Sequence, residues 1–383
     1  MDLDWSPEQQ AFREALRAWL AANVPTERRP HDLAAAAAFD RAWQRQLFEG
    51  GWAGLNWPVE YGGRGLSILQ QVIWYEEYVR AGGPPMGLRF VAQNHAGPTL
   101  IALGTEAQKA AHLQPILTGQ HLWCQGFSEP NAGSDLASLR TRAEVDGDHL
   151  VVTGQKIWTT GADQADFQEL LVRSEPGSER HKGLAWVICP MDAPGIEIRP
   201  IRKMTGRAEF CAVFYDEVRI PLANVVGRLH EGWATAMATL GFERGTSFIG
   251  EMAEIAMRLE DLIAEARASG ADRDDELRRK LADRRAEVAA LRALNYANLS
   301  RYARGERPGA EGSITKLFTN EVARSVQELA LELAGGVALD GDLAENEAAE
   351  AWLNGMVLTI GGGTPEIQRE IIADRVLELP RSR

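Results

Sequence analysis

Apolar side chains recur at helical spacing in the first third of the chain. The run Ser6-Pro7-Glu8-Gln9 supplies an N-cap, a proline at the first helical position and a capping-box glutamine. Phe12, Leu16 and Leu20 then follow at intervals of four residues, which puts them on one face of a helix. Glycine- and proline-rich segments separate further helical stretches, so residues 1–120 are predicted to form an N-terminal helical domain.

The pattern changes after Trp123. Residues 142–153 alternate in short β-favouring runs around the turn Asp146-Gly147-Asp148, which predicts a hairpin. Further stretches with the composition of strands are 184–189, 196–201 and 210–220. These elements predict a central β domain, a small barrel or sheet, over residues 121–230.

Helical periodicity returns near Gly232 and persists to the end of the chain. One helix is predicted over residues 234–268, ending near Gly270, and a second begins after Asp274. A C-terminal domain with a four-helix bundle is therefore predicted over residues 231–383. The order helices, sheet, helices indicates an α+β fold that is mostly helical, not alternating βαβ units. No GxGxxG motif follows a predicted strand, so a Rossmann nucleotide site is not indicated.

Charge and composition narrow the function classes. The 383 residues include 41 Lys and Arg against 54 Asp and Glu, a formal net charge of -13. Phosphate backbones and anionic lipids repel such a chain, so neither nucleic acid nor membrane is expected as a partner. The N-terminus lacks the basic and apolar regions of a secretory signal, and no apolar run approaches the roughly 20 residues that span a bilayer.

The cysteines and histidines give no sign of a metal site. Cys124, Cys189 and Cys211 are scattered and form no CxxC pair, and the seven histidines show no HExxH spacing. We therefore expect no disulfide framework, no metal ligand set and a cytoplasmic location, because a reducing compartment suits unpaired thiols.

Two stretches around the predicted sheet could grip an aromatic ligand. Residues 125–135 combine the turn-forming run Pro130-Asn131-Ala132-Gly133 with hydroxyl and amide groups, although serine and aspartate in such loops often bond only their own backbone. Residues 156–162, directly after a predicted strand, supply Trp158 and two threonines. They could wall a cofactor ring, or the tryptophan could belong to the core.

A third stretch near the C-terminus has the features of an anion site. Gly361-Gly362-Gly363 allows backbone to approach a ligand closely, and Thr364 with Pro365 is typical of a helix N-terminus, where free amides attract anions. The alternative is a flexible loop before a well-capped terminal helix.

Together these stretches resemble one family, the acyl-CoA dehydrogenases, over nearly the whole chain. The residues that carry the resemblance are Gly51-Trp52 through Gly65, Glu76-Glu77, the run Gly104 through Lys109, the loop 128–135, the Trp158 motif and Glu366-Ile367-Gln368-Arg369. It implies an N-terminal helical domain, a central β domain and a C-terminal four-helix domain in a tetramer, with FAD between the β domain and the C-terminal helices.

The resemblance also implies roles for individual residues. Ser128 and nearby amides would meet the pyrimidine edge of the flavin, Trp158 would cover a ring face, and Thr160 would address N5. The complete set assigned to FAD is Gln125, Phe127, Ser128, Gly133, Ser134, Trp158, Thr160, Arg278, Gly335, Thr364 and Glu366. Two positions depart from the family: Leu281-Ala282 stands where its R-x-x-F-G motif has Phe-Gly, and Glu332 stands where Gln is frequent.

The catalytic base is the main departure. Many members carry it in Tyr-Glu-Gly-Thr, but this chain has Gly362 at the glutamate position, which can still donate its amide to a thioester carbonyl. A second group, including isovaleryl-CoA dehydrogenases, carries the base on a C-terminal-domain helix, where Glu243 stands before Arg244. The resemblance thus assigns Glu243 as base and Ser134, Arg244 and Gly362 to acyl-CoA binding. Without it, Glu243 would be interpreted as a solvated carboxylate beside an arginine.

Four functions remain open. The first is a dehydrogenase that passes electrons to an electron-transfer flavoprotein, as a homotetramer or a heterotetramer. The second is an acyl-CoA oxidase or flavin monooxygenase of the same fold. The third is a non-catalytic or co-catalytic subunit of a mixed tetramer, favoured by Leu281-Ala282 and Glu332 and opposed by Glu243. The fourth, a DNA-binding variant, conflicts with the acidic charge.

Overall fold

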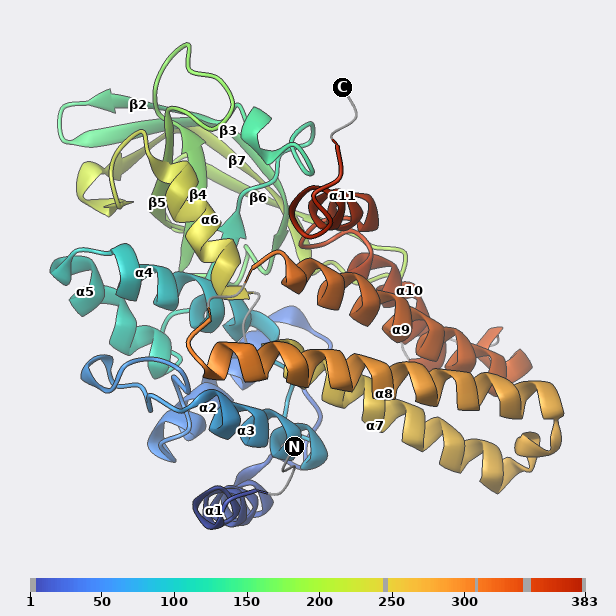
Figure 1. Ribbon diagram of the computed structural model, residues 1–383. Coiled ribbons are helices and arrows are strands. Elements are labelled where there is room, and N and C mark those ends of the chain that lie inside the picture. The colour runs from blue at the N-terminus through green and yellow to red at the C-terminus, as the bar shows by residue number, and fades with distance from the viewer. Residues whose placement is uncertain (1–4, 244–246, 307–308, 340–345, 381–383) are drawn as a thin grey trace.

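The computed structural model describes residues 5–243, 247–306, 309–339 and 346–380. Helices at the N-terminus, a twisted sheet and a bundle of long helices form three packed parts (Figure 1). This confirms the predicted mostly helical α+β fold. The helices that precede the sheet are α1 (Pro7–Asn23), α2 (Leu33–Glu49), α3 (Ile68–Arg80), the π-helix η3 (Ala92–Ala96), α4 (Gly97–Leu103) and α5 (Glu106–Leu117).

Helix α1 begins where the sequence predicts. Ser6 Oγ accepts from the backbone N–H of Gln9, and the Gln9 side chain accepts from the backbone N–H of Ser6, so both halves of the capping box are present. Leu16 and Leu20 are fully buried and pack with tryptophans of α2 and α3. The predicted apolar face is therefore the face that joins the N-terminal helices.

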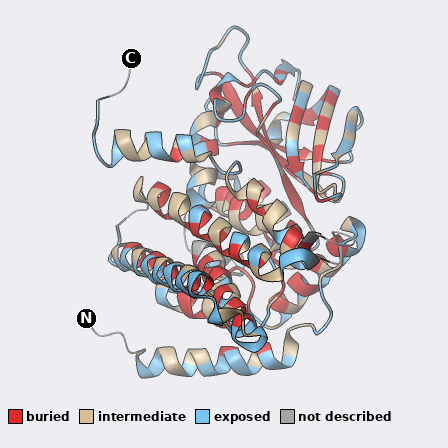
Figure 2. Ribbon diagram, turned by 90° about the vertical axis from the view of Figure 1, so that its right-hand side faces the viewer, coloured by how far each residue is buried: buried red, intermediate tan, exposed pale blue. Residues whose placement is uncertain are grey.

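The sheet has eight strands in the order β6-β7-β3-β2-β4-β5-β8, and β1 pairs with β4. The predicted hairpin at 142–153 is the antiparallel pair β2–β3, and the three other predicted strands are β5, β6 and β7. The bounds are β1 (Trp123–Gly126), β2 (Arg142–Asp146), β3 (His149–Thr160), β4 (Phe167–Arg173), β5 (Leu184–Pro190), β6 (Ile196–Ile201), β7 (Phe210–Pro221) and β8 (Val225–Val226). Buried residues line these central strands in Figure 2.

The helices that follow the sheet belong to two packing units. Within the predicted helix 234–268 the structure describes α6 (Gly232–Glu243) and α7 (Ser247–Ser269), and residues 244–246 lie outside the described part. α6 packs on β5, α4 and η3, whereas α7 packs on α3 and the bundle. A Cβ on Gly232 would lie 2.5 Å from the Ala185 backbone, so α6 can begin against β5 only with glycine there.

The bundle ends the chain. α7, α8 and α9 pack on one another, and α10 and α11 pack on α9. The remaining bounds are α8 (Asp275–Ala303), α9 (Glu311–Ala334), α10 (Glu347–Leu358) and α11 (Pro365–Arg375). Two polar contacts join the β6–β7 connection to α10: Lys203 Nζ donates to Asn354 at 2.8 Å and Arg207 donates to Glu350 at 2.7 Å. None of the described helices is long and apolar enough to cross a membrane.

One buried carboxylate connects α1 to α3. Glu77 on α3 is 3% exposed and accepts from Arg13 and Arg17, each at 2.6 Å, and from Arg80. Burial alone would raise the pKa of this carboxyl, but the hydrogen bonds from Arg17, Arg13 and Arg80 outweigh burial and lower it to about 2. The charged form of Glu77 is therefore the form that the fold stabilises.

We predict that Glu77→Gln lowers the free energy of unfolding by about 2 kcal/mol at pH 7, because three guanidinium groups lose a charged acceptor. The folded pKa lies below the unfolded value, so this contribution is complete above about pH 4.5 and is lost as the pH falls toward 2. Urea unfolding of both proteins from pH 3 to 7 measures the difference. A gap that stays constant across this range would contradict the assignment, and Glu260→Gln, at an exposed ion pair, is the control.

Candidate functional site

Strand β1 and the loop after it hold the first group of predicted site residues. Gln125 is half-buried on β1, and its side-chain Nε2 donates to Glu169 Oε1 of the neighbouring strand β4 at 2.7 Å. Phe127 is 4% exposed and packs in the core shared by the N-terminal helices, the sheet and α6. The Ser128 carbonyl accepts from the Ile157 N–H at 2.9 Å, which attaches the loop to β3.

A buried ion pair holds this loop against the sheet. Lys156 is fully buried and its Nζ donates to Glu129 at 2.9 Å and to the Phe127 carbonyl at 3.0 Å. Glu129 also accepts from the backbone N–H groups of Arg140 and Thr141 at 2.7 and 2.8 Å. Every one of these bonds crosses between segments that border the loop, so the loop conformation depends on this pair.

The two charges titrate differently because burial acts on them in opposite senses. Burial lowers the pKa of Lys156 to about 8 although Glu129 opposes the shift. Burial would raise the pKa of Glu129, but attraction to Lys156 and the hydrogen bonds to Thr141, Lys156 and Arg140 bring it below its ordinary value. At pH 7 both groups are charged, and the pair persists as an ion pair.

Trp158 stands on a β-bulge, not after the strand. The sequence predicts that residues 156–162 follow a strand, but β3 continues to Thr160, so this prediction is wrong in position. The pairing register with β7 shifts between Lys156 and Thr159, and Trp158 has a φ of 62°. This left-handed conformation, costly for an aromatic residue, re-aims the indole outward, where it is 56% exposed and meets Phe210 edge to face.

Gly133 and Ser134 lie at the tip of the same loop. The backbones of Glu129 and Ala132 exchange two hydrogen bonds of 3.0 Å, which close a tight turn before Gly133. Both Gly133 and Ser134 are exposed, and a Cβ added at Gly133 would meet nothing within 4 Å. Thr160 is also exposed, at the end of β3 opposite Phe210. The structure thus gathers the predicted residues of β1, its loop and β3 at one end of the sheet.

The glycine loop before α11 has its carbonyl groups occupied. Lys316 donates to the Gly361 carbonyl at 2.7 Å, and Gln368 Nε2 donates to the carbonyls of Gly362 and Gly363 at 3.1 and 3.3 Å. Within the described part of the chain, the backbone N–H groups of Gly362 and Gly363 donate no hydrogen bond. Gly362 has a φ of 65°, so the loop presents amides where a side chain would be strained.

Helix α11 begins as predicted. Thr364 is its N-cap and accepts from the Ile367 N–H at 3.4 Å, with Pro365 at the first position. Glu366 is exposed in the first turn, and bonds from its own backbone N–H and from Thr364 lower the pKa of its carboxyl. This end therefore has both free amides and a carboxylate.

Arg278 is in the first turn of α8, and Gly335 directly follows α9. The turn between α7 and α8 lies away from the sheet in Figure 1. Arg278 pairs with Asp275 of its own helix at 2.5 Å. Gly335 caps α9 with a φ of 59°. Nearby, Glu332 accepts from Lys280 at 2.8 Å, so the carboxylate that departs from the family pattern is neutralised inside the chain.

The predicted base and its neighbour fall at the limit of the structure. Glu243 is the last residue of α6, but its side chain lies outside what the structure describes, and Arg244 lies outside the described residues. Two residues earlier, about half a turn away and so on another face of the helix, a Cβ on Gly241 would meet no described atom within 4 Å. The backbone of α6 therefore borders open space just before Glu243.

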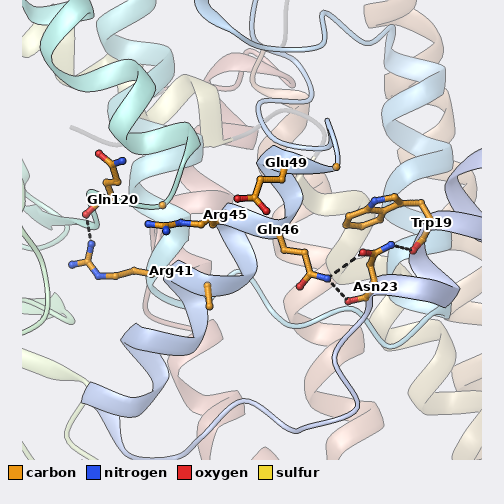
Figure 3. Close-up of a pocket in the computed structure, with 10 residues that line it drawn as sticks. Trp19, Asn23, Arg41, Arg45, Gln46, Glu49 and Gln120 are labelled. Atoms are coloured by element: carbon orange, nitrogen blue, oxygen red, sulfur yellow. Dashed lines mark hydrogen bonds between the residues drawn. The ribbon is translucent and has the colours of Figure 1, made fainter.

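A large open groove lies away from all these residues. It is an open depression of about 980 Å³ between α1, α2 and the segment after α5, lined by Trp19, Arg41, Gln46, Glu49 and Gln120, among others (Figure 3). Arg41 is engaged by Asp166 at 2.8 Å and by the Gln120 carbonyl. The groove contains none of the predicted site residues. A smaller pocket of about 310 Å³ lies beside Glu129 and Arg140.

Sequence reasoning missed the polar residues that support the site. It assigned no role to Glu129, Lys156, His95 or Glu169. Lys156 carried a usable signal, because it shares the inward parity of Leu150 and Val152 on its strand, and a lysine at such a position needs a buried partner. His95 and Glu169 carried no such signal, since these two hydrogen-bond partners are 74 residues apart in the sequence.

Three domain models of one family match most of the chain. The chain matches the acyl-CoA dehydrogenase N-terminal domain over residues 6–120, the middle domain over 124–218 and the C-terminal domain over 230–377. It belongs to the acyl-CoA dehydrogenase family and is an oxidoreductase of that family.

Individual relatives are similar to this chain over nearly their whole length. The chain is 42% identical to acyl-CoA dehydrogenase IpdE1 of Mycobacterium tuberculosis over 387 aligned positions, which cover 97% of this chain and 98% of that protein. Among solved structures it is similar to a Tcur3481-Tcur3483 steroid ACAD (36% identity, TM-score 0.87, all of both chains). It is also similar to the ChsE4-ChsE5 complex of M. tuberculosis (32% identity, TM-score 0.82, all of both chains).

The residues present fit a flavin. The family is flavin-dependent, with FAD as its usual cofactor. Three features of this chain suit it: the strained bulge that exposes the Trp158 indole, the open space beyond Gly133, and a helix N-terminus at Thr364 preceded by the amides of Gly362 and Gly363, which bond no described group. An aromatic face for a ring and backbone donors for anionic groups are what such a cofactor requires.

We predict that Lys156→Met weakens FAD binding by about a hundredfold, because it leaves the Glu129 carboxylate buried without its cation and frees the loop 127–135. Breaking a buried pair costs roughly 3–5 kcal/mol, part of which appears as lost ligand affinity. Adding Glu129→Gln should recover at least tenfold. FAD affinity by equilibrium dialysis is the measurement, and Lys203→Met, at a partly exposed ion pair, is the control. Unchanged FAD affinity in Lys156→Met would contradict the proposed dependence of the loop 127–135 on this ion pair.

Proposed function

We propose that the chain catalyses FAD-dependent α,β-dehydrogenation of an acyl-CoA thioester, with Glu243 as the base that removes the α proton. When bound, FAD supplies the hydride acceptor at N5 for the hydrogen that leaves the β carbon. The family supports the reaction class. The observation that carries the assignment of the base is the glycine at position 362.

The family places its base at one of two positions, as the resemblance implies. At the first, Gly362 has a φ of 65° and no side chain to take a proton. The carboxylate at the second is Glu243, at the end of α6. With Gly362 unable to act, Glu243 is the remaining candidate.

The other residues polarise and align the substrate. The N–H of Gly362, which donates to no described group, can donate to the thioester carbonyl, and this bond would strengthen as enolate character grows in the transition state. The carbonyls of this loop are occupied by Lys316 and Gln368, so its amides are fixed before substrate arrives. Ser134 and Arg244 are proposed to contact the CoA portion, and Trp158 and Thr160 to border the flavin.

We further propose that electrons pass to an electron-transfer flavoprotein and that the protein works in the cytoplasm. The family resemblance supports the electron-transfer flavoprotein as the acceptor. The cytoplasmic location is supported by Cys124, Cys189 and Cys211, which are buried free thiols in the structure, as suits a reducing compartment.

A second candidate is a subunit of a mixed tetramer, supported by the far end of the bundle. There Leu281-Ala282 stands where the family motif has Phe-Gly, and Arg278 is paired with Asp275 of its own helix at 2.5 Å. A diphosphate would have to replace Asp275 as the partner of this guanidinium. Two similar structures are named as two-component assemblies, Tcur3481-Tcur3483 and ChsE4-ChsE5. The flavin-to-chain ratio and mass of the protein expressed alone separate a homotetramer from a chain that needs a partner.

For the base, we predict that Glu243→Gln keeps FAD bound but lowers substrate-driven flavin reduction at least a thousandfold, as loss of a general base should. Anaerobic absorbance titration with a panel of acyl-CoAs measures it, with Glu260→Gln as a control on an exposed carboxylate of α7. Near-normal reduction in Glu243→Gln would refute the assignment. Wild-type protein that binds FAD but bleaches with no acyl-CoA would count against CoA thioesters as substrates.

A weaker response is expected from relocating the carboxylate. Adding Gly362→Glu to Glu243→Gln should recover part of the reduction rate if both positions face the same α carbon. Recovery should remain partial, because a side chain at a φ of 65° costs roughly 1–2 kcal/mol. Stopped-flow flavin bleaching compares the double and single variants. Equal rates would contradict the expectation that both positions face the same α carbon.

A further inference from the structure

Three polar side chains meet in the interior beside β1. Glu169 of β4 is fully buried, His95 of η3 is 4% exposed, and Gln125 of β1 is half-buried. Glu169 Oε1 lies 3.0 Å from His95 Nδ1 and 2.7 Å from Gln125 Nε2, and Gln125 Nε2 lies 3.2 Å from His95 Nδ1. The cluster joins a strand of the sheet, its parallel neighbour and a helix.

The cluster lies beside apolar core residues. Glu169 lies on a strand whose next residues, Leu170 and Leu171, are fully buried and apolar. A buried carboxylate is costly to desolvate, and well-packed apolar residues in its place are often as stable or more so. Buried polar groups of this kind are concentrated at functional positions.

Its surroundings lead to the proposed active site. His95 lies in a π-helix, an element found frequently at functional sites. That π-helix packs on α6, and the Thr99 and Thr239 hydroxyls bond at 2.9 Å where α4 meets α6. Gln125 begins the stretch that the sequence assigns to the flavin edge. The cluster therefore lies behind the first residue of the proposed flavin loop.

The hydrogen bond to Glu169 orients the Gln125 amide. Its nitrogen donates to Glu169 Oε1 at 2.7 Å, so the carbonyl oxygen of Gln125 is directed away from that carboxyl group. Gln125 is only half-buried, so this oxygen is available to a ligand. The pyrimidine part of a flavin ring carries an N–H donor that a carbonyl oxygen can accept.

We propose that Glu169 and His95 are positioning residues that hold the Gln125 amide so that its carbonyl oxygen accepts a hydrogen bond from the flavin. This inference rests on the proposed function, since it requires that FAD binds at this loop. It gives the buried cluster a role in cofactor recognition through Gln125, without contact of its own with the cofactor.

A double-mutant cycle tests the indirect action. Glu169→Leu and Gln125→Leu should each weaken FAD binding about tenfold, the value of one hydrogen bond to a well-placed partner. The double variant should also lose only about tenfold, because the second change removes a partner that no longer acts. Equilibrium dialysis of the purified proteins against FAD gives the dissociation constants. A loss of about a hundredfold in the double variant, the product of the singles, would overturn the proposal.

Two further variants separate positioning from a general packing effect. Glu169→Gln keeps an acceptor for the Gln125 amide and should bind FAD within about threefold of wild type. Gln168→Leu is the matched control: Gln168 is the adjacent residue of β4, equally buried, and bonds Tyr215 instead of Gln125. It should lower the unfolding midpoint and leave FAD affinity unchanged. Equal FAD loss in Gln168→Leu and Glu169→Leu would refute the positioning role.

The proposed reaction is tested separately. Bleaching of wild-type flavin by an acyl-CoA would support the dehydrogenase function even where the cycle proved additive. Wild-type protein that binds no FAD would overturn both proposals, and this result is visible before any variant is made.

Discussion

The ion pair between Glu129 and Lys156 is the interaction on which the candidate site depends. It is buried, it collects two backbone N–H groups and one carbonyl in addition to its own contact, and it fixes the loop after β1 to the strand that carries Trp158. Placing two charges in the interior is costly, and an apolar pair would often be as stable. What the ion pair adds is direction, because each hydrogen bond specifies one relative position of loop and strand. The exposed indole and the loop tip can then keep a constant separation without a ligand between them.

The elements were predictable where local chemistry decides them. The Ser6 capping box, the β2–β3 hairpin and the Thr364 cap are formed by residues at most a few positions apart, and each lies where the sequence indicates. The family resemblance was confirmed for the same reason, since it rests on local motifs spread along the chain. The predicted end of β3 was wrong because the strand continues past a bulge to Thr160. The bulge depends on pairing with β7, which no local run of residues specifies.

The site was predictable only in part. Residues 125–128, Trp158 and Thr160 do meet at one end of the sheet, although their roles toward a cofactor remain predictions. The supporting polar groups were not predicted, since Glu169 and His95 are 74 residues apart in the sequence and are brought together by the tertiary packing of η3 and β4. The departure at position 362 was visible in the sequence, but its consequence was not. Only the structure shows that Gln368 and Lys316 occupy the loop carbonyls, while the N–H groups of Gly362 and Gly363 donate to no group in the part of the chain that the structure describes.

The division of the helices after the sheet has a mechanical consequence. α6 is anchored in the core that joins the sheet to the N-terminal helices, and α7 is anchored in the core of the bundle with α3. Glu243 ends the first of these helices. The glycine loop at 361–363 belongs to the second body through Lys316 of α9. In the proposed reaction the base and the carbonyl donor would therefore come from two packing units, and their separation would depend on how these two cores pack together. We would then expect substitutions where α3 packs on α7 to change the rate without altering any group proposed to contact the substrate.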